Sequence, residues 1–243
     1  MIFGFGRRRQ PGLFITGTDT GVGKTYVGVM IVRALRAAGH RVGVYKPVAT
    51  GCRREGARWI SDDAVALWEA AGRPASLDQV CPQCFAAPLA PPVAAHEEGR
   101  QVDPHLLRSG FNFWRDQSDV VVVEGVGGLM SPLSEQDLVG DLAADLALPL
   151  VIVARNALGT INHTLLTLFA ASAWPGLNNR QADLRVAGVV LNQCHDPAGD
   201  PSVASNRGEL EARWQDSVLA EVAWRSQRFE PEVDWFALAA KAG

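Results

Sequence analysis

Short runs of apolar residues alternate along the chain with longer segments in which apolar residues recur at helical spacing. The apolar runs predict strands at 13–16, 42–45, 120–123, 149–153, 186–191 and 218–222. The segments between them predict helices at 24–38, from the N-cap residue Ser61 onward, and at 104–117, 138–146, 161–173, 209–217 and 233–242. The stretch 74–101 is rich in Pro and Ala and is expected to be an irregular connection.

Continuously apolar strands separated by helices are typical of a parallel sheet that is covered on both faces. We therefore expect an α/β fold of the doubly wound type, with a mostly parallel sheet of the P-loop NTPase kind. Since neither a repeat nor a linker divides the sequence, residues 1–243 should form a single domain. Residues 1–11, which include the basic run 7–9, are expected to be a flexible tail.

Composition narrows the class of protein. Of 243 residues, 47% are apolar and 20% are charged, which is ordinary for a globular protein, and the net charge of −3 gives no general attraction to nucleic acid or anionic membrane. No window approaches the roughly 20 apolar residues of a membrane span, and no signal-peptide core follows the arginines, so we expect a cytoplasmic protein. The four cysteines suggest no disulfide framework. The pair Cys81-x-x-Cys84 lacks the second ligand pair of a zinc site and is interpreted as two ordinary thiols.

Residues 17–25, GTDTGVGKT, resemble the phosphate-binding pattern G-x-x-x-x-G-K-[ST], although the first glycine stands one residue too early. A predicted strand precedes the segment and a predicted helix follows it, as that loop requires. Gly21 and Gly23 would let backbone N–H groups approach a phosphate. Lys24 would reach the β- and γ-phosphate oxygens, and the Thr25 hydroxyl would bind Mg²⁺.

Polar residues follow several of the other predicted strands. Lys46 follows strand 42–45, Glu124 and a glycine-rich turn follow strand 120–123, and Asn192 follows strand 186–191. Ligands of open parallel sheets bind at the carboxyl ends of the strands, so these groups should meet at one site. Glu124 is expected to bind a metal, because an unpaired buried carboxylate is costly. Lys46 is expected to steer an anion or to stabilise a transferring phosphoryl group.

At this point the chain resembles the dethiobiotin synthetase family. The resemblance is carried by GTDTGVGKT (17–25), YKPVATG (45–51), VEGVGGLMSPLS (123–134) and LGTINHTLLT (158–167), and more weakly by DDAVAL (62–67) and FAAPLAP (85–91). It implies an enzyme that uses ATP, Mg²⁺ and CO₂ to close the ring of dethiobiotin from 7,8-diaminononanoate, through a carbamate and a carbamic-phosphoric anhydride, with release of ADP and phosphate. It also implies a homodimer with the substrate near the interface.

The resemblance assigns roles to individual residues. Lys46 and Lys24 would be catalytic, and Thr25, Asp63 and Glu124 would be the magnesium ligands. The substrate would meet Thr20, Lys46, Thr50, Gly159 and Asn162. ATP would contact Gly21, Val22, Gly23, Lys24, Thr25, Tyr26, Asp63, Glu124, Gly125, Val126, Gly127, Asn192, Gln193, Val222, Ala223 and Trp224.

The sequence departs from the family in two places. Family members often have Ser and His near Ala90 and Pro92, so the end of the site that binds the substrate carboxylate is expected to differ here. The segment 222–228, VAWRSQR, carries Ala223 where the family usually has Pro. Both departures lie in segments that connect the predicted strands and helices.

Three other functions fit a phosphate-binding loop. A partitioning-type switch ATPase would carry a lysine early in the loop, where this chain has Asp19. A cobyrinate-type amide synthetase would need a further glutamine-hydrolysing domain, for which the chain has no room. A non-catalytic binding module has no need of Lys24, Thr25, Lys46 and Glu124 together.

Overall fold

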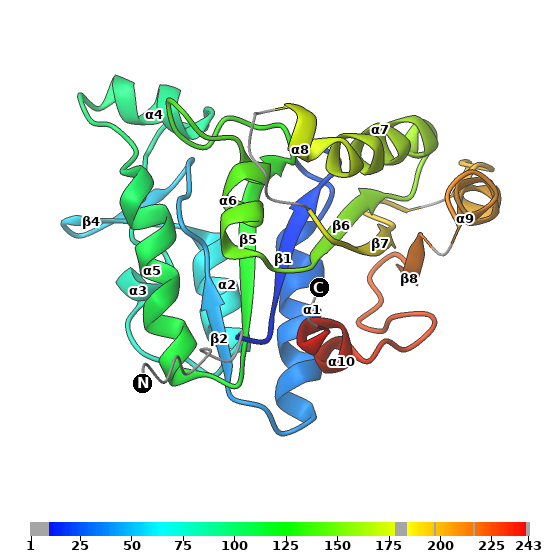
Figure 1. The fold of residues 1–243 in the computed structure, drawn as a ribbon, viewed down its shortest axis with the longest axis horizontal. Coiled ribbons are helices and arrows are strands. Elements are labelled where there is room, and N and C mark those ends of the chain that lie inside the picture. Colours follow the sequence, from blue (N-terminus) through cyan, green and yellow to red (C-terminus); the bar gives the residue numbers. More distant parts are fainter. Residues whose placement is uncertain (1–9, 178–183, 197, 216, 242–243) are drawn as a thin grey trace, which may run out of the picture.

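The computed structural model describes residues 10–177, 184–196, 198–215 and 217–241. Six strands form one sheet in the order β2-β5-β1-β6-β7-β8 (Figure 1). The strands are β1 (Gly12–Gly17), β2 (Val42–Tyr45), β5 (Val120–Gly128), β6 (Leu150–Arg155), β7 (Val186–Asn192) and β8 (Val218–Val222). The pairings between neighbouring strands of this sheet are parallel, which confirms the predicted fold class.

Helices cover both faces of the sheet. In Figure 1, α1 and α2 lie behind the strands, and α5 and α6 lie in front of them. The helices are α1 (Lys24–Ala37), α2 (Asp62–Ala70), α3 (Leu77–Val80), α4 (Pro91–Glu97), α5 (Pro104–Gln117), α6 (Val139–Leu146), α7 (Thr160–Ser172), α8 (Trp174–Leu177), α9 (Val203–Glu211) and α10 (Trp235–Ala240). An antiparallel pair, β3 (Arg53–Glu55) and β4 (Arg58–Ile60), stands apart from the main sheet.

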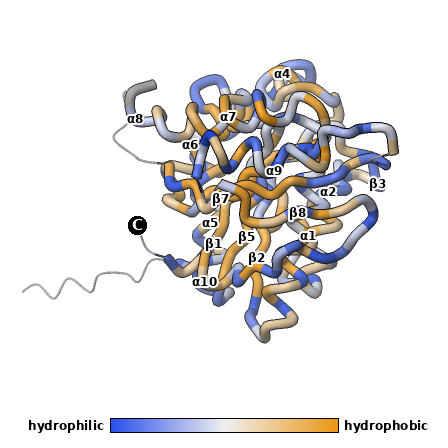
Figure 2. The backbone as a smooth tube through the Cα atoms, turned by 90° about the vertical axis from the view of Figure 1, so that its right-hand side faces the viewer, coloured by the Kyte–Doolittle hydropathy of each residue, from blue (hydrophilic) through white to orange (hydrophobic). Residues whose placement is uncertain are grey.

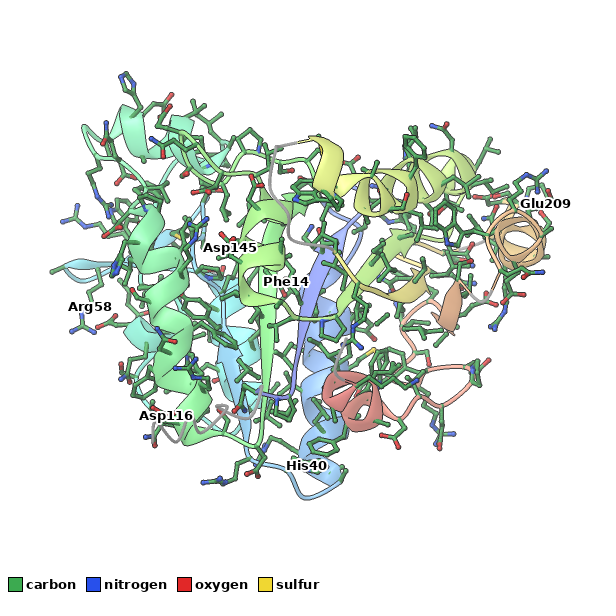
Figure 3. All side chains as sticks on the ribbon, viewed as in Figure 1. Phe14, His40, Arg58, Asp116, Asp145 and Glu209 are labelled. Atoms are coloured by element: carbon green, nitrogen blue, oxygen red, sulfur yellow. The ribbon has the colours of Figure 1, made fainter. Side chains whose placement is uncertain are left out.

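The core lies between the sheet and its two helical layers. All six residues of β1 are buried, and the central strands of Figure 2 are coloured mostly as hydrophobic. In Figure 3 the fully buried Phe14 lies at the centre of the sheet, whereas Arg58, Asp116 and Glu209 lie at the periphery. A strand that is buried on both faces has no polar alternation, which explains why these strands appear in the sequence as continuous apolar runs.

Local signals predicted several element ends correctly. The Ser61 hydroxyl accepts a hydrogen bond of 3.3 Å from the Ala64 N–H and caps α2, as expected. Helix α5 has the predicted bounds, because the Asp103 carboxylate accepts hydrogen bonds from two N–H groups of its first turn. Strand β8 also has the predicted bounds.

The prediction of an irregular connection over 74–101 is wrong. This stretch contains α3 and α4. Ser76 and Gln79 form a capping box at the start of α3, a signal that was present in the sequence, and Pro91 stands in the first turn of α4. The hairpin of β3 and β4 was not predicted, because its residues are largely exposed and show no apolar alternation.

The predicted helix 209–217 is also misplaced. Helix α9 instead spans Val203–Glu211 and packs inward through Asn206 and Leu210. Its other positions are mostly polar, so the apolar spacing that indicates a helix is weak. Residues 212–215, which the prediction placed in the second half of the helix, instead form turns.

A further correction concerns Glu124, which we expected to follow its strand. Strand β5 continues through Glu124 to Gly128. Its pairing with β1 passes through a register shift, from Ile15↔Glu124 to Gly17↔Gly128, so Gly128 is paired with β1 while Gly125 and Gly127 lie in the irregular part between. The carboxylate of Glu124 therefore projects from a buried position within the strand, and not from a loop after it.

The chain ends are described only in part. Residues 1–9, most of the predicted tail, lie outside the described residues, as do 242 and 243 at the end of the last predicted helix. Gln10 donates a hydrogen bond of 3.0 Å to the Ser118 carbonyl, and the Pro11 carbonyl accepts one of 3.0 Å from Val121. Among the described residues, none of the helices has the length and apolar character that crossing a bilayer requires.

Candidate active site

A cavity of about 790 Å³ opens at the carboxyl ends of β1, β2 and β5. Strand order places β1 between β5 and β6, so the chain leaves β1 at the point where open α/β sheets bind ligands. The predicted site residues that line the cavity are Thr20, Gly21, Gly23, Lys24, Thr25, Lys46, Thr50, Asp63, Gly125, Val126 and Gly127. Residues that are up to 107 positions apart in the sequence therefore meet here, as the reading of the strand ends predicted.

The loop between β1 and α1 has the backbone shape of an anion-binding turn. Gly21 and Gly23 have φ values of 75° and 86°, a region that favours glycine. A Cβ atom on Gly23 would lie 2.1 Å from Nδ2 of Asn192, so this position also needs glycine for space. The Lys24 ammonium donates a hydrogen bond of 3.1 Å to the carbonyl of Asp19, so it folds back over the loop. The loop and its lysine are thus preformed.

A buried cluster of charges stands beside the loop. The Lys46 ammonium lies 2.5 Å from Oε1 of Glu124 and 3.1 Å from Oδ2 of Asp63. Lys46 is 4% exposed and Glu124 is completely buried. The Thr25 hydroxyl donates to the same Glu124 oxygen at 2.9 Å. All three predicted metal ligands are therefore within one connected group that has Lys46 at its centre.

The charges of this cluster shift one another's pKa values. Burial alone would lower the pKa of Lys46, but Glu124 and Asp63 outweigh it and raise the pKa above its ordinary value. Burial likewise raises the pKa of Asp63, but the Lys46 charge and hydrogen bond more than reverse this, so the pKa is lowered. Burial lowers the pKa of Lys24, and Glu124 only partly opposes this change. The charged form of Lys46 is therefore favoured by its two carboxylate neighbours.

The residues fit a magnesium ion. Oε2 of Glu124 is buried and has no hydrogen-bond partner among the described residues, although a bare carboxylate oxygen is costly to bury. Within those residues, no group of three or more His, Cys, Asp or Glu side chains is arranged to hold a metal. Mg²⁺ in nucleotide sites typically takes only one or two protein carboxylates and completes its shell with phosphate oxygens and water. Glu124, Asp63 and Thr25 supply that kind of partial set.

The residues expected at the base of ATP lie on the other side of the loop. The Asn192 side chain is buried and donates a hydrogen bond of 3.0 Å to the Val22 carbonyl, so it holds the phosphate loop. The Gln193 side chain accepts a hydrogen bond of 3.0 Å from the backbone N–H of Trp224, the residue after Ala223. The Tyr26 hydroxyl donates to the Ser226 carbonyl. The segment after β8 is thereby tied both to β7 and to the first turn of α1.

Gly159 and Asn162 lie elsewhere. Gly159 has a φ of 95° and caps α7, and Asn162 belongs to the first turn of that helix. Among the described residues that line the cavity of about 790 Å³, neither of them occurs. The single chain therefore does not bring these two residues together with Lys46.

The segment around Ala90 was expected near the substrate carboxylate, but no site role was assigned to the other residues of this part of the cavity wall. Pro88 to Pro91 line the cavity together with Ala49, Ser131 and Pro132. The Ser131 hydroxyl accepts a hydrogen bond of 2.8 Å from the Gly128 N–H and closes the turn after β5. The proline-rich composition of this segment indicates a loop, but it does not show which part of the protein the loop packs against.

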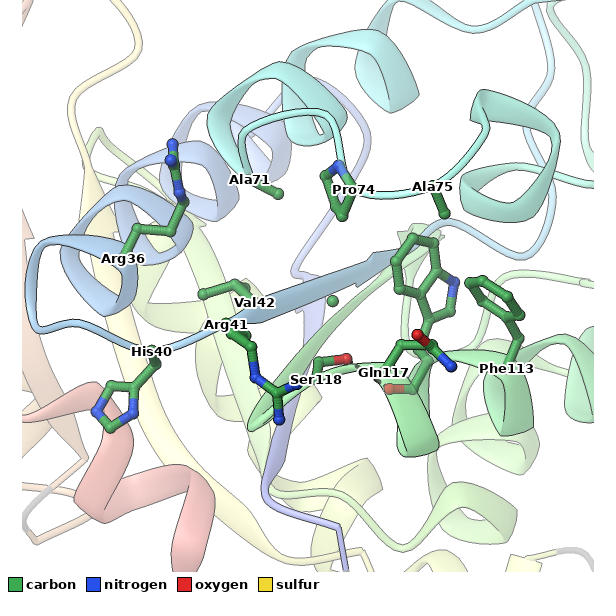
Figure 4. Close-up of a pocket in the computed structure, with 12 residues that line it drawn as sticks. Arg36, His40, Arg41, Val42, Ala71, Pro74, Ala75, Phe113, Gln117 and Ser118 are labelled. Atoms are coloured by element: carbon green, nitrogen blue, oxygen red, sulfur yellow. Dashed lines mark hydrogen bonds between the residues drawn. The ribbon is translucent and has the colours of Figure 1, made fainter.

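A second cavity, of about 400 Å³, lies at the amino end of β2 (Figure 4). Arg36, His40 and Arg41 line it together with the aromatic rings of Phe113 and Trp114. The Arg41 guanidinium pairs with Asp119 at 2.7 Å, and Arg36 donates to the Ala70 carbonyl at 3.1 Å. The two arginines are thus already engaged by neighbouring protein groups.

Comparison with known proteins adds independent information. A family model described as an AAA domain matches residues 11–231. The protein named ATP-dependent dethiobiotin synthetase BioD of Rhodopirellula baltica is 45% identical over 213 residues, which cover 83% of this chain and 79% of that protein. The protein of the same name from Anaeromyxobacter dehalogenans is 42% identical over 222 residues, which cover 91% and 92%.

A solved structure confirms the fold. The chain is similar to pNOB8 ParA bound to nonspecific DNA, with a TM-score of 0.51, 14% sequence identity and coverage of 94% of this chain and 90% of that one. At this level of identity the likeness concerns the arrangement of the strands and helices alone.

Proposed function

Because the chain belongs to the ATP-dependent dethiobiotin synthetase family, we propose that it closes the ureido ring of dethiobiotin from 7,8-diaminononanoate, CO₂ and ATP. The observation that carries the proposal is the buried Lys46–Glu124 pair, with the exposed Asp63 bound to the same ammonium, beside a preformed phosphate loop. A phosphate site with a fixed buried cation suits transfer of a phosphoryl group to a weak nucleophile, because such a transfer depends on positioning and charge stabilisation.

In the proposed reaction, CO₂ adds to one amine of the diamine to give a carbamate. The carbamate attacks the γ-phosphate of ATP, and the resulting carbamic-phosphoric anhydride is then attacked by the second amine. This last step closes the ring and releases phosphate. Thr20 and Thr50, which line the cavity, would hold the amines and the carbamate by hydrogen bonds.

The chain's own groups have distinct tasks in this scheme. The N–H groups of the loop and the ammonium of Lys24 would bind the phosphates. Lys46, which lines the cavity, would stabilise the negative charge of the transferring group. Mg²⁺, held by Thr25, Asp63 and Glu124, would neutralise phosphate charge when bound. Gly125, Val126 and Gly127 would line the nucleotide, with Asn192, Gln193, Val222, Ala223 and Trp224 toward its base.

We further propose that the enzyme is a homodimer. Four large apolar side chains on and near α7 are exposed: Met130 by 50%, Leu158 by 87%, Leu166 by 59% and Phe169 by 65%. Such a concentration is typical of an interaction surface. Gly159 and Asn162 stand at the start of the same helix, so across a dimer they would reach the substrate carboxylate of the partner's cavity. Light scattering tests this, because Phe169→Glu should give a monomer with intact fold, and an unchanged mass would contradict it.

We also propose that the protein works in the cytoplasm, where ATP and bicarbonate are present. Its four cysteines are free thiols, which agrees with a reducing compartment. Cell fractionation with an antibody to the protein checks this location.

The test of the function is a coupled assay of phosphate release with ATP, Mg²⁺, bicarbonate and the diamine. Release should require all four, and mass spectrometry should identify dethiobiotin among the products. Release that continues without the diamine would contradict the synthetase and favour a partitioning-type switch ATPase. Asp19, at the position where that class carries its lysine, supports the expected outcome.

A further inference from the structure

Three cysteines gather behind the wall of the active site. The Sγ atoms of Cys81 and Cys84 lie 3.5 Å apart. Cys52 donates its backbone N–H to the Phe85 carbonyl at 3.0 Å, which places it beside Cys84, and the neighbouring Cys84 thiol raises the pKa of Cys52. Cys52 and Cys81 are buried and Cys84 is half-buried, and all three are free thiols. The Cys-x-x-Cys motif, which the sequence indicated to be two unrelated thiols, is therefore a close pair with a third thiol beside it.

The segment that carries this pair is joined to the segment that follows β2. Lys46 donates its backbone N–H to the Val80 carbonyl at 2.8 Å, and Ala49 donates to the Gln83 carbonyl at 2.8 Å. Cys84 itself pairs with Ala49 in a short parallel bridge, and Ala49 lines the active-site cavity. A change in the backbone of 81–84 would therefore be transmitted to Lys46 and to the cavity wall.

Cys84 has a second connection to the site. Its sulfur lies near the backbone of Ser61, the N-cap of α2, and this contact lowers the pKa of the thiol. Two residues later, Asp63 pairs with Lys46. The thiol of Cys84 thus touches both segments that hold the charge cluster in place.

We propose that Cys81 and Cys84 form a disulfide when the protein meets hydrogen peroxide, and that this oxidation lowers the turnover of the synthetase. The Cys84 thiolate attacks one peroxide oxygen, the O–O bond breaks, and the leaving hydroxide takes up a proton to become water. The sulfenic acid at Cys84 is then attacked by the sulfur of Cys81, with loss of its proton and release of a second water. Two thiols and one peroxide give one disulfide and two waters.

The short distance between the two sulfur atoms favours disulfide formation, whereas the raised pKa of Cys84 slows its attack on the peroxide. A disulfide needs sulfur atoms about 2.05 Å apart, so the pair must approach by roughly 1.5 Å. At Cys84 the hydrogen bond from Cys52 lowers the pKa, but the hydrogen bond with Cys81 and burial outweigh it and raise the pKa to about 12. The thiolate is therefore scarce, and oxidation should be slower than that of an ordinary exposed thiol.

The experiment compares three forms of the full-length protein after exposure to hydrogen peroxide and alkylation of the remaining thiols. In the wild type, peptide mapping should find a Cys81–Cys84 link, and a dithiol reductant should remove it. Cys84→Ser should form no such link. Cys194→Ser, which removes the fourth thiol, should behave as the wild type does. Absence of the link in the wild type would overturn the proposal.

The activity arm rests on the proposed function. Oxidised wild type should lose turnover by roughly tenfold to a hundredfold, the loss typical when a catalytic group is displaced by about 1 Å, and should recover it on reduction. An equal loss in Cys84→Ser, or a complete link with unchanged turnover, would overturn the inhibitory role. A reduced protein that makes no dethiobiotin would refute the function instead, and the mapping result would still stand. If Cys84→Ser does not fold, Cys81→Ser removes the same pair from its other side.

Discussion

The two ends of the sheet hold oppositely charged pairs in very different surroundings. At the carboxyl end, Lys46 and Glu124 form a pair whose side chains are 5% and 0% exposed. At the amino end, Arg41 and Asp119 form a pair whose side chains are 71% and 37% exposed. Both ends also have a cavity, one of about 790 Å³ and the other of about 400 Å³ (Figure 4).

The difference shows where charge serves function. Removing two ions from water costs several kcal/mol each, and a hydrophobic pair of similar volume is often at least as stable. An exposed pair carries no such cost and contributes little. The buried pair is therefore the one whose presence needs a reason other than stability. Both ends have a cavity lined by cations, and what sets the carboxyl end apart in charge is that its pair is buried.

Lys46→Ala should have the largest effect. We expect turnover to fall by about 10²- to 10³-fold, the loss typical when one stabilising group is removed from developing charge. The affinity for ATP should fall much less, because Lys24 and the loop remain. Steady-state kinetics and nucleotide titration measure the two quantities. An equal loss of ATP binding would mean that Lys46 is mainly a nucleotide ligand.

The same variant should also be less stable. Glu124 would be left buried without its cation, and breaking a buried pair in this way costs roughly 3–5 kcal/mol. Denaturant unfolding without nucleotide measures this. A variant as stable as the wild type would show that the charge of Glu124 is compensated by some other group.

Gly43→Ala tests the amino end for packing. A Cβ atom at this position would lie 2.4 Å from the Ser118 hydroxyl oxygen and 3.0 Å from the Trp114 ring. We expect a loss of about 1–3 kcal/mol, the usual cost of overpacking, with little change in turnover. Thermal unfolding and the phosphate assay measure both. A large drop in turnover would show that the two ends of β2 are mechanically coupled.

Low pH should remove the difference in stability between the wild type and the variant Asp63→Asn. The folded pKa of Asp63 is lowered, so its pairing with Lys46 stabilises the fold above the ordinary carboxyl value of 3.8. That contribution should be lost as the pH falls from about 4 through the lowered folded value. The two proteins should therefore differ in stability at neutral pH and converge in strong acid. A difference in stability that persists in acid would mean that the substitution acts through packing and not through the charge of Asp63.

Arg41→Ala should have the smallest effect. Its pair with Asp119 is exposed, and such pairs contribute little that can be measured. Turnover should stay unchanged and the melting temperature nearly so. A clear loss of turnover would break the contrast between the two ends of the sheet.

The sequence allowed the carboxyl end to be predicted because strand ends in a parallel sheet converge. Lys46 and Glu124 each follow an apolar run, and this position in the chain is enough to bring them together. The Ser61 cap depends on neighbouring residues only, so it was also predictable. These features need either local rules or the topology of the sheet.

Other features depend on contacts that the sequence does not display. Asn192 was expected to contact ATP, and its side-chain amide donates to the Val22 carbonyl, 170 residues away in the chain. Its contact with the base stays a prediction. Helix α9 buries Asn206, which donates to the Asn156 side chain at 2.8 Å, so a polar residue occupies a position that apolar spacing would assign to the surface. The pairing of 80–85 with the segment after β2 is equally non-local.

The central place of β1 in the sheet has a consequence for how the protein folds during its synthesis. Strand β1 pairs with β5 and β6, which are both translated after it, and Thr18 of the phosphate loop donates its N–H to the Val153 carbonyl at 3.0 Å. The loop also needs Asn192 to hold it. The loop is therefore translated well before Asn192, which stands 170 residues after Val22, and contacts of such separation form slowly. Nucleotide can stabilise the fold only late in synthesis, so the early apolar strands must be protected from aggregation by other means.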